Sequence, residues 1–379
     1  MHQLRRSVTV LGAAGVLAAG LLPATPAHAS TTGWRVNHRV KAGTETAMTA
    51  IAALGRADAW TMGAFTAQSG SDVLHPVITR WNGRSWNQVT LPAGVRAKWT
   101  ADVPLATMAA SSDSNLWAFS LDTAHYLRRN GTHWSTGALP VPAGADEVVP
   151  SVGVARTPSE VWALGFSQTG QQLSPYAARF DGHAWSLVPV PGSGPIVAAS
   201  AISGQDIWAV IGTRLINGLQ DTTKTPSVVH WNGTAWKKVT LPSRLPGNPS
   251  SILARSDHDV WIGGGRKNRK GGTTEYVAHD TGAALHVTTM RAAALAVPFH
   301  MIRLVSDGTG GLWGLGADLG LSSSRLWHLT GTKWHGPVRP DFGSEAFLFS
   351  LAHPGGTSSV WGVGEIAGRG LIALDGRVP

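Results

Sequence analysis

The chain has 379 residues, of which 43% are hydrophobic and 14% charged, and its formal net charge is +9. It contains no cysteine, which excludes disulfide cross-links, a thiol nucleophile and any thiolate metal site. Tryptophan exceeds the other aromatic residues, with 17 Trp against 8 Phe and 3 Tyr, which indicates one structural position that is filled many times.

Residues 1–29 have the pattern of a secretory signal peptide. Arg5 and Arg6 form a basic start, residues 8–22 are apolar, and Ala27-His28-Ala29 is a small-x-small cleavage site. We therefore expect cleavage after Ala29 and a secreted, extracellular domain over residues 30–379. The adjacent arginines leave both general secretion and twin-arginine export open.

A polar or small residue stands two positions before a Trp seven times along the chain. The pairs are Asp58 and Trp60, Asn115 and Trp117, Glu160 and Trp162, Asp206 and Trp208, Asp259 and Trp261, Gly311 and Trp313, and Ser359 and Trp361. The spacing is about 50 residues, a period typical of propellers and repeat arrays.

A turn dipeptide that ends in glycine also recurs seven times. The glycines are Gly83, Gly131, Gly182, Gly233, Gly282, Gly331 and Gly376, and in six repeats the third residue after the glycine is Trp86, Trp134, Trp185, Trp236, Leu285 or Trp334. Asn-Gly between apolar runs is a strong hairpin signal, because both residues of a tight turn need positive φ.

The repeat over residues 206–242 shows the pattern most clearly. Trp208 lies in one short apolar run, Val228–Trp231 forms a second, and Trp236 begins a third after Asn232-Gly233. Another small and apolar run, such as residues 196–201, precedes each of these sets. We therefore predict an all-β fold: a seven-bladed β-propeller with four antiparallel strands in each blade, forming one domain over residues 30–379.

The two ends of the chain complement each other. After Gly376 only three residues remain, so the last repeat lacks its fourth strand. Residues 33–40 resemble a fourth strand with no partner of their own. We predict that residues 32–40 pair with residues 371–375 and close the ring, which leaves no unpaired outer edge.

The repeat resembles the kelch type of propeller, which combines apolar run, glycine, aromatic strand, Trp and proline at about 50 residues per blade. It is also similar to secreted propellers of GC-rich Gram-positive (actinobacterial) bacteria, which carry a Val-Trp-Ala-x-Gly run in each blade. The sequence departs from kelch in its glycine pair, which survives only at Gly263-Gly264-Gly265. The resemblance implies architecture and no particular function. The copper site of the kelch-type oxidases needs a cysteine, so it does not carry over.

We interpret the two Trp series as wedges between blades. Trp99 fits neither series and lies beside Lys98 in the connection between Pro92 and Pro104. We expect an exposed Trp99 that contacts a ligand, with a buried position as the alternative. In the exposed case Trp99→Ala costs less than about 1 kcal/mol.

The polar residues before the first Trp series could form a ring of metal ligands. Asp and Asn in tight turns more often bond their own backbone, which is the interpretation we favour. The histidines lack zinc-ligand spacing, and His258 in its turn is expected to be exposed and without a role. We therefore expect no metal and no cofactor.

In a four-stranded blade the long connections all emerge on one face of the ring. This face would carry the basic run Arg266, Lys267, Arg269 and Lys270, together with Lys98 and Trp99. Since no catalytic motif stands out, we expect a non-enzymatic binding module for a glycan, an anionic wall polymer or a protein. We expect a monomer, no membrane span in the mature chain and no nucleic-acid partner.

The alternative is a secreted polysaccharide hydrolase or lyase. Acid–base residues for that reaction would come from the same loop-rich face, near the centre of the ring. The candidates are Asp102, Glu147, His300 and Glu345.

Overall fold

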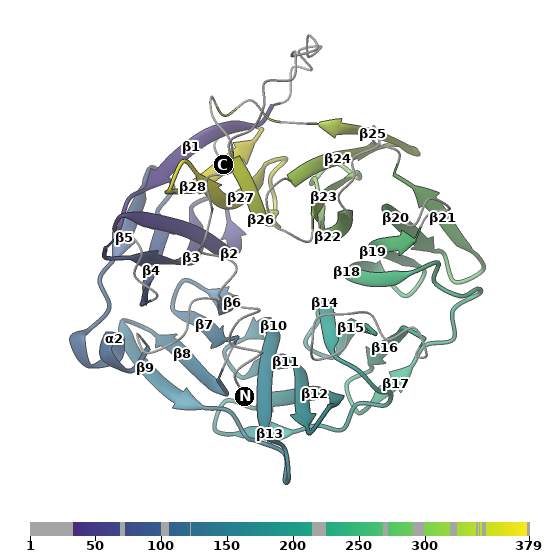
Figure 1. Cartoon of the computed structure of the whole chain (residues 1–379), viewed down its shortest axis with the longest axis horizontal. Coiled ribbons are helices and arrows are strands. Elements are labelled where there is room, and N and C mark those ends of the chain that lie inside the picture. The colour runs from purple at the N-terminus through teal and green to yellow at the C-terminus, as the bar shows by residue number, and fades with distance from the viewer. Residues whose placement is uncertain are drawn as a thin grey trace.

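A computed structural model describes residues 33–68, 73–99, 106–121, 123–213, 225–267, 272–290, 299–318, 324–338, 340, 342 and 346–376. Seven four-stranded antiparallel sheets stand around a central axis as the blades of a propeller (Figure 1). The prediction of an all-β, seven-bladed propeller is therefore confirmed. Blades 1 to 6 follow each other along the chain, and blade 7 combines the two ends.

The four strands of each blade lie side by side, in order from the centre of the ring outward. The innermost strands are β2 (Glu45–Gly55), β6 (Ala106–Ser112), β10 (Glu147–Thr157), β14 (Ile196–Ser203), β18 (Asn248–Ser256), β22 (Phe299–Ser306) and β26 (Ala346–Ala352). The second strands are β3 (Asp58–Thr66), β7 (Asn115–Ser120), β11 (Glu160–Thr169), β15 (Asp206–Ile211), β19 (Asp259–Lys267), β23 (Leu312–Asp318) and β27 (Val360–Ile366).

Two further strands complete each blade. The third strands are β4 (Leu74–Trp81), β8 (His125–Asn130), β12 (Gln172–Phe180), β16 (Ser227–Trp231), β20 (Thr273–Asp280), β24 (Ser324–Thr330) and β28 (Arg369–Asp375). The outermost strands are β5 (Trp86–Val89), β9 (His133–Ala138), β13 (Trp185–Leu187), β17 (Trp236–Lys238), β21 (Leu285–Thr289), β25 (Lys333–Val338) and β1 (Arg35–Val40).

Strand β1 closes the ring, as predicted. It pairs antiparallel with β28, placing Arg35 opposite Leu374 and Val40 opposite Gly370. Figure 1 shows β1, drawn in purple, as the outer strand beside the yellow β28 in the blade that ends the chain. The first and last strands of the domain are thus joined by ladder hydrogen bonds, and blade 7 has no unpaired third strand.

The tryptophans of the second and outermost strands pack the blades together. Each second-strand Trp meets the outermost-strand residue of the next blade, so the predicted wedges are confirmed. The pairs are Trp60 and Trp134, Trp117 and Trp185, Trp162 and Trp236, Trp208 and Leu285, Trp261 and Trp334, Trp313 and Trp34, and Trp361 and Trp86. The indole pairs have ring centroids 5.2 to 6.3 Å apart, in the range of favourable aromatic contacts.

The expected exposure of Trp99 is wrong. Its side chain is 3% exposed and belongs to the core cluster that contains Leu91, Met108 and Trp134. The reason is the short helix α2 (Ala93–Trp99), which turns the connection back against β4 and β9. A side chain buried in this way offers no surface to a ligand.

Removal of residues 30–40 is expected to abolish cooperative folding, because it unpairs β28 and removes the Trp34 indole from Trp313. Thermal unfolding followed by circular dichroism tests this, with the chain that begins at Ser30 as the control. A truncated chain with an unchanged melting temperature would contradict the role assigned to β1.

Trp208→Ala and Trp99→Ala are expected to destabilise the fold by similar amounts, about 3–5 kcal/mol each, because both indoles are buried. Val141→Ala is the control: Val141 is 51% exposed, so its truncation should change the stability by no more than about 0.5 kcal/mol. Urea unfolding measures all three. A Trp99→Ala variant as stable as the Val141 variant would contradict the buried position.

Candidate functional site

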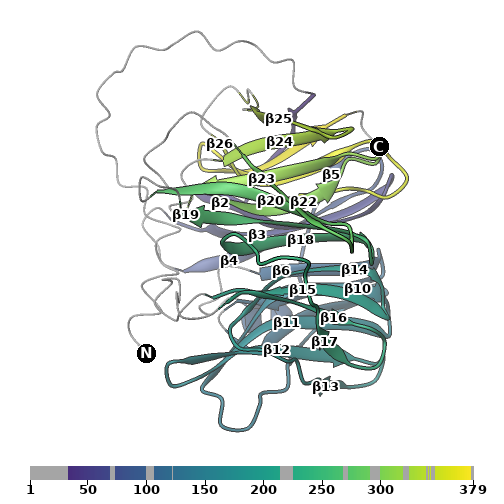
Figure 2. The ribbon, with the colours of Figure 1, turned by 90° about the vertical axis from the view of Figure 1, so that its right-hand side faces the viewer.

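The two faces of the ring differ in their connections. Seen from the side, the strands run between one face and the other (Figure 2). The longest connections are 90–105, which joins the outermost strand β5 to the innermost strand β6, and 212–226, which joins the second strand β15 to the third strand β16. The strand ends that they join lie on the same face of the ring, which we call the loop face. The opposite face, here the turn face, carries tight connections such as 113–114 and 257–258. The predicted asymmetry is therefore present, although 353–359 on the turn face is longer than its counterparts.

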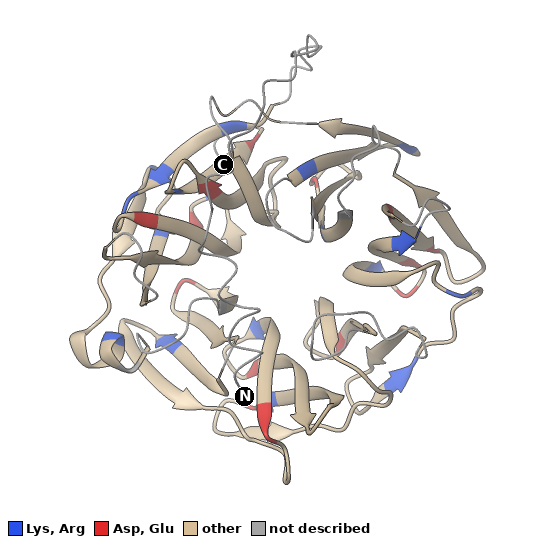
Figure 3. Cartoon of the chain, in the orientation of Figure 1, with Lys and Arg blue, Asp and Glu red and all other residues tan. Residues whose placement is uncertain are grey.

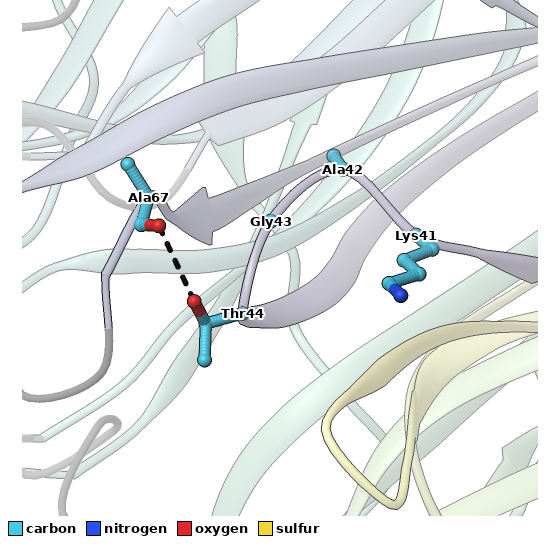
Figure 4. Close-up of a pocket in the computed structure, with 5 residues that line it drawn as sticks. All are labelled: Lys41, Ala42, Gly43, Thr44 and Ala67. Carbon is cyan, nitrogen blue, oxygen red and sulfur yellow. Dashed lines mark hydrogen bonds between the residues drawn. The ribbon is translucent and has the colours of Figure 1, made fainter.

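A depression on the loop face lies at the seam between blades 7 and 1. It has a volume of about 460 Å³ and is lined by Lys41, Ala42, Gly43, Thr44 and Ala67 (Figure 4). The Thr44 hydroxyl donates to the Ala67 carbonyl at 3.3 Å, and the Thr44 amide donates to Thr66 at 2.9 Å. The lining is therefore mostly backbone held by hydrogen bonds, with one exposed ammonium group, that of Lys41.

Two carboxylates, one from each blade, lie at this seam. Glu365 lies near the end of β27 and Glu45 begins β2. Burial raises the pKa of Glu365, and the negative charge of Glu45 adds to the effect. The amide of Thr46 donates to Gly368 at 3.0 Å, so the turn after Glu365 is bonded directly to β2.

A buried carboxylate lies between blades 5 and 6, near the loop face. Glu275 of β20 is 2% exposed, and Arg325 of β24 is 5% exposed. Burial raises the pKa of Glu275 to about 7, although the charge of Arg325 acts in the opposite direction. Room for the carboxylate comes from Gly316, because a Cβ at this position would overlap Oε1 of Glu275.

Three of the predicted site residues lie around this carboxylate. His300 of β22 packs against Gly265, the ladder partner of Glu275. The next residue on β19, Arg266, donates to the Thr289 hydroxyl at 2.6 Å, and Lys267 is exposed. Arg269 and Lys270 lie outside the described residues, as does the side chain of Lys98. The structure thus joins His300 to part of the predicted basic run, a neighbourhood that sequence spacing does not reveal.

Two of the four predicted catalytic residues, Glu147 and His300, lie in different blades. Glu147 begins β10 in blade 3, whereas His300 lies in β22 of blade 6. Blades 4 and 5 separate these strands in the ring (Figure 1). Asp102 and Glu345 lie outside the described residues.

The turn face carries a repeated polar ladder that sequence analysis missed. In blade 4, Oδ1 of Asp206 accepts bonds from Trp208 Nε1 at 3.1 Å and from His230 Nε2 at 2.7 Å. The imidazole of His230 also stacks on the indole of Trp208, with centroids 4.5 Å apart. Asp206 therefore bonds the indole and a basic residue of the third strand, partners that the expected bonding of these acids to their own backbone does not include.

A basic residue of the third strand lies against the Trp in the other blades as well, and the bond from the indole to the turn residue recurs at Trp117 and Trp261. The corresponding turn residue, Trp and basic residue are Asp58, Trp60 and Arg80; Asn115, Trp117 and Arg128; Glu160, Trp162 and Arg179; Asp259, Trp261 and His279; and Asp307, Trp313 and His328. The sequence does contain a signal for it: a basic residue stands three positions before the turn glycine in six repeats. In blade 7 that place in the ladder is taken by Leu374, opposite Trp361.

Asp307 is the acid of blade 6, and it also stabilises its turn. Burial would raise its pKa, but bonds from the Thr309 amide and from His328 outweigh burial and lower it. Oδ1 of Asp307 accepts from the amides of Thr309 and Gly311, both at 2.8 Å. In this blade the expected bonding of the turn acid to its own backbone is present beside the ladder.

Comparison with known proteins supports the fold alone. No protein-family profile matches the chain, and no characterised protein matches it in sequence. A structure of YCF48 bound to D1 peptide is similar with a TM-score of 0.56 at 12% identity, covering 91% of this chain and 97% of that chain. A catalytically inactive virginiamycin B lyase from Staphylococcus aureus with quinupristin is similar with a TM-score of 0.55 at 13% identity, covering 91% and 100%. YCF48 from Cyanidioschyzon merolae gives 0.54 at 12% identity, covering 90% and 98%.

A peptide-bound protein and a lyase therefore resemble this chain equally well. The propeller by itself does not choose between binding and catalysis. No helix in the described part of the chain is long and apolar enough to span a bilayer.

Glu275 is expected to make the stability of the fold depend on pH. Its folded pKa of about 7 lies above its ordinary value of 4.5, so the folded state holds the proton more tightly than the unfolded state. The contribution of protonated Glu275 to the free energy of unfolding is complete below pH 4.5 and is lost as the pH rises through 7.

Comparing wild type with Glu275→Gln by urea unfolding from pH 4.5 to 8 measures this contribution. The stability of wild type relative to the variant should fall over that range by up to about 3 kcal/mol, at about 1.4 kcal/mol per pKa unit. Parallel stability curves for the two chains would show that the carboxyl of Glu275 titrates normally.

Proposed function

We propose that this chain is a secreted, non-enzymatic binding module whose ligand contacts the loop face over blades 5 and 6. The favoured ligand is anionic: a wall polymer or an acidic glycan, with an acidic protein surface as the alternative. Secretion is proposed from the signal-peptide pattern of residues 1–29, and the kelch-like and actinobacterial resemblance of the repeats is compatible with it.

The observation that carries the proposal is the gathering of cationic and titratable groups at one end of the blade 5–6 junction. Arg266 and Lys267 end β19, His300 is the second residue of β22, and Arg325 lies buried in β24. Two acids accompany them: Glu275, which is buried, and Asp318, which ends β23 opposite Phe299. Elsewhere in the described chain, acidic and basic residues are spread over several blades (Figure 3). A local excess of positive charge on a rigid scaffold favours an anionic partner.

The turn face offers less for a ligand. Its acids are engaged within the protein, as Asp259 is by Trp261 at 2.6 Å and His279 at 2.9 Å. Ligand contacts concentrate on loops held by a rigid scaffold, and the long connections belong to the loop face. A monomer is sufficient for this function, because each chain carries the complete junction.

The similarity to the peptide-bound YCF48 agrees with a binding role, and the similarity to virginiamycin B lyase keeps the enzymatic alternative open. A polysaccharide hydrolase or lyase would need converging acid–base groups. Glu147 and His300 lie in separate blades, and Glu275, whose pKa of about 7 would suit proton transfer, is only 2% exposed. Binding without turnover is therefore the better supported function.

Lys267→Glu is expected to weaken binding to an anionic polymer about fivefold, because an exposed ion pair contributes up to about 1 kcal/mol. Arg84→Glu, which reverses another exposed charge on the turn face, is the matched control and should leave affinity unchanged. Binding of purified chain to teichoic acid, to acidic and neutral glycans and to an acidic protein is measured at low and high salt, with turnover assayed in parallel.

Wild-type binding that weakens at high salt, together with a loss of affinity in Lys267→Glu but not in Arg84→Glu, supports the proposal. Equal loss in both variants would indicate attraction to net charge without a site. Turnover of a glycan that is lost in His300→Gln would replace the proposed function with the enzymatic one.

A further inference from the structure

One group of potential metal ligands lies on the turn face, at the junction between blades 4 and 5. Asp206 begins β15, His230 lies in β16, and Asp257 follows the last residue of β18. One ligand atom from each lies within 4.8 Å of the other two. This is the one such group among the described residues, and it is remote from the loop face.

The corresponding place at the junction between blades 1 and 2 holds a cation between two carboxylates. There the guanidinium of Arg80 lies between two carboxylates, 3.4 Å from Asp58 and 2.7 Å from Asp113. Asp113 and Asp257 occupy the same place, directly after the last serine of an innermost strand. His230 stands where Arg80 stands, three residues before the turn glycine.

The exchange of arginine for histidine changes the chemistry of the position. A guanidinium is always charged and balances both carboxylates, whereas a neutral imidazole contributes no charge and offers a lone pair instead. Two carboxylate oxygens and an imidazole nitrogen form a donor set that suits Zn²⁺, with a fourth position open to water. We propose that Asp206, His230 and Asp257 bind a divalent metal ion of the zinc class that joins blades 4 and 5.

Surrounding contacts hold two of these ligands in place. The indole of Trp208 donates to Asp206 and stacks under the imidazole of His230, which are the outer contacts that orient metal ligands. In blade 5 the guanidinium of Arg255 reaches Asp259 at 3.9 Å, but the corresponding residue of blade 4 is Ile202, so no such cation competes for Asp206.

The ligand atoms need a small adjustment to bind a metal. Two ligands of a tetrahedral ion with bonds of about 2.0–2.1 Å lie about 3.3 Å apart. Asp206 Oδ1 and His230 Nε2 are 2.7 Å apart, so this pair must open by rotation of the carboxylate. Asp257 is exposed and lies on a turn, so it can approach from the other side.

Blade 5 supplies an internal control. His279 stacks on Trp261 and bonds Asp259 at 2.9 Å, as in blade 4. The residue of blade 6 that corresponds to Asp257 is Asp307, which bonds His328 of its own blade at 2.9 Å. His279 therefore belongs to a two-residue pair and is not expected to bind a metal.

The test is titration of the untagged, EDTA-stripped chain with Zn²⁺ by calorimetry and with Co²⁺ by visible absorption. Wild type is expected to bind one equivalent and to melt at a higher temperature with Zn²⁺ present. Asp257→Asn should bind at least about tenfold more weakly, since even outer-shell changes cost about 10–100-fold. His230→Arg, which copies Arg80, should fold and bind none, while His279→Arg should bind as wild type does.

Absence of stoichiometric binding in wild type would overturn the proposal and assign the group to an ion pair of imidazolium with carboxylate. Undiminished binding in both Asp257→Asn and His230→Arg would also overturn it, because the metal would then lie elsewhere. Circular dichroism checks the fold of each variant, and if His230→Arg does not fold, the exposed Asp257→Asn substitution decides the question by itself.

Discussion

The structure depends on one contact repeated around the ring: a second-strand Trp packed against the outermost strand of the next blade. A four-stranded blade cannot bury its faces alone, so each blade needs its neighbours. The contact between Trp313 and Trp34 belongs to the same series although the two residues lie far apart in the chain. Ring closure therefore uses the same Trp packing as the remaining junctions, together with the β1–β28 hydrogen bonds. The chain, which has no cysteine, needs no covalent link between its ends.

This packing separates the two faces chemically. On the turn face the acids bond a basic residue from the third strand, and in blades 4 and 5 also the wedge indole, so the polar groups there complete the core contacts. On the loop face the connections are free of that task, and side chains such as Lys267 and Lys41 are exposed. The proposed binding of an anionic ligand follows from this division, since the scaffold is rigid where the charges gather.

The ladder also shows how a repeat can diversify without altering the fold. Arg80, Arg128 and Arg179 occupy in three blades the position that histidines occupy in the next three. Both residue types can stack on an indole and bond a carboxylate, so packing tolerates the exchange. Among the described residues, only at the blade 4–5 junction do a histidine in this position and two carboxylates bring their ligand atoms within 4.8 Å of one another. A structural ion pair and the proposed metal site thus differ by one side chain.

Sequence by itself determined the number of blades, the strands and the closure, because periodic Trp and turn glycines report local geometry that every blade repeats. It also placed Arg266, Lys267 and His300 on the loop face through strand order. Only the tertiary structure decided that Trp99 is buried, since α2 packs on strands distant in sequence, and that Glu275 lies beside Arg325. The partners of the turn acids were decided in the same way, because a third-strand cation is brought to them by sheet register. Periodicity reveals what each repeat does alone, whereas contacts between blades depend on residues about 50 positions apart, whose pairing only the assembled ring specifies.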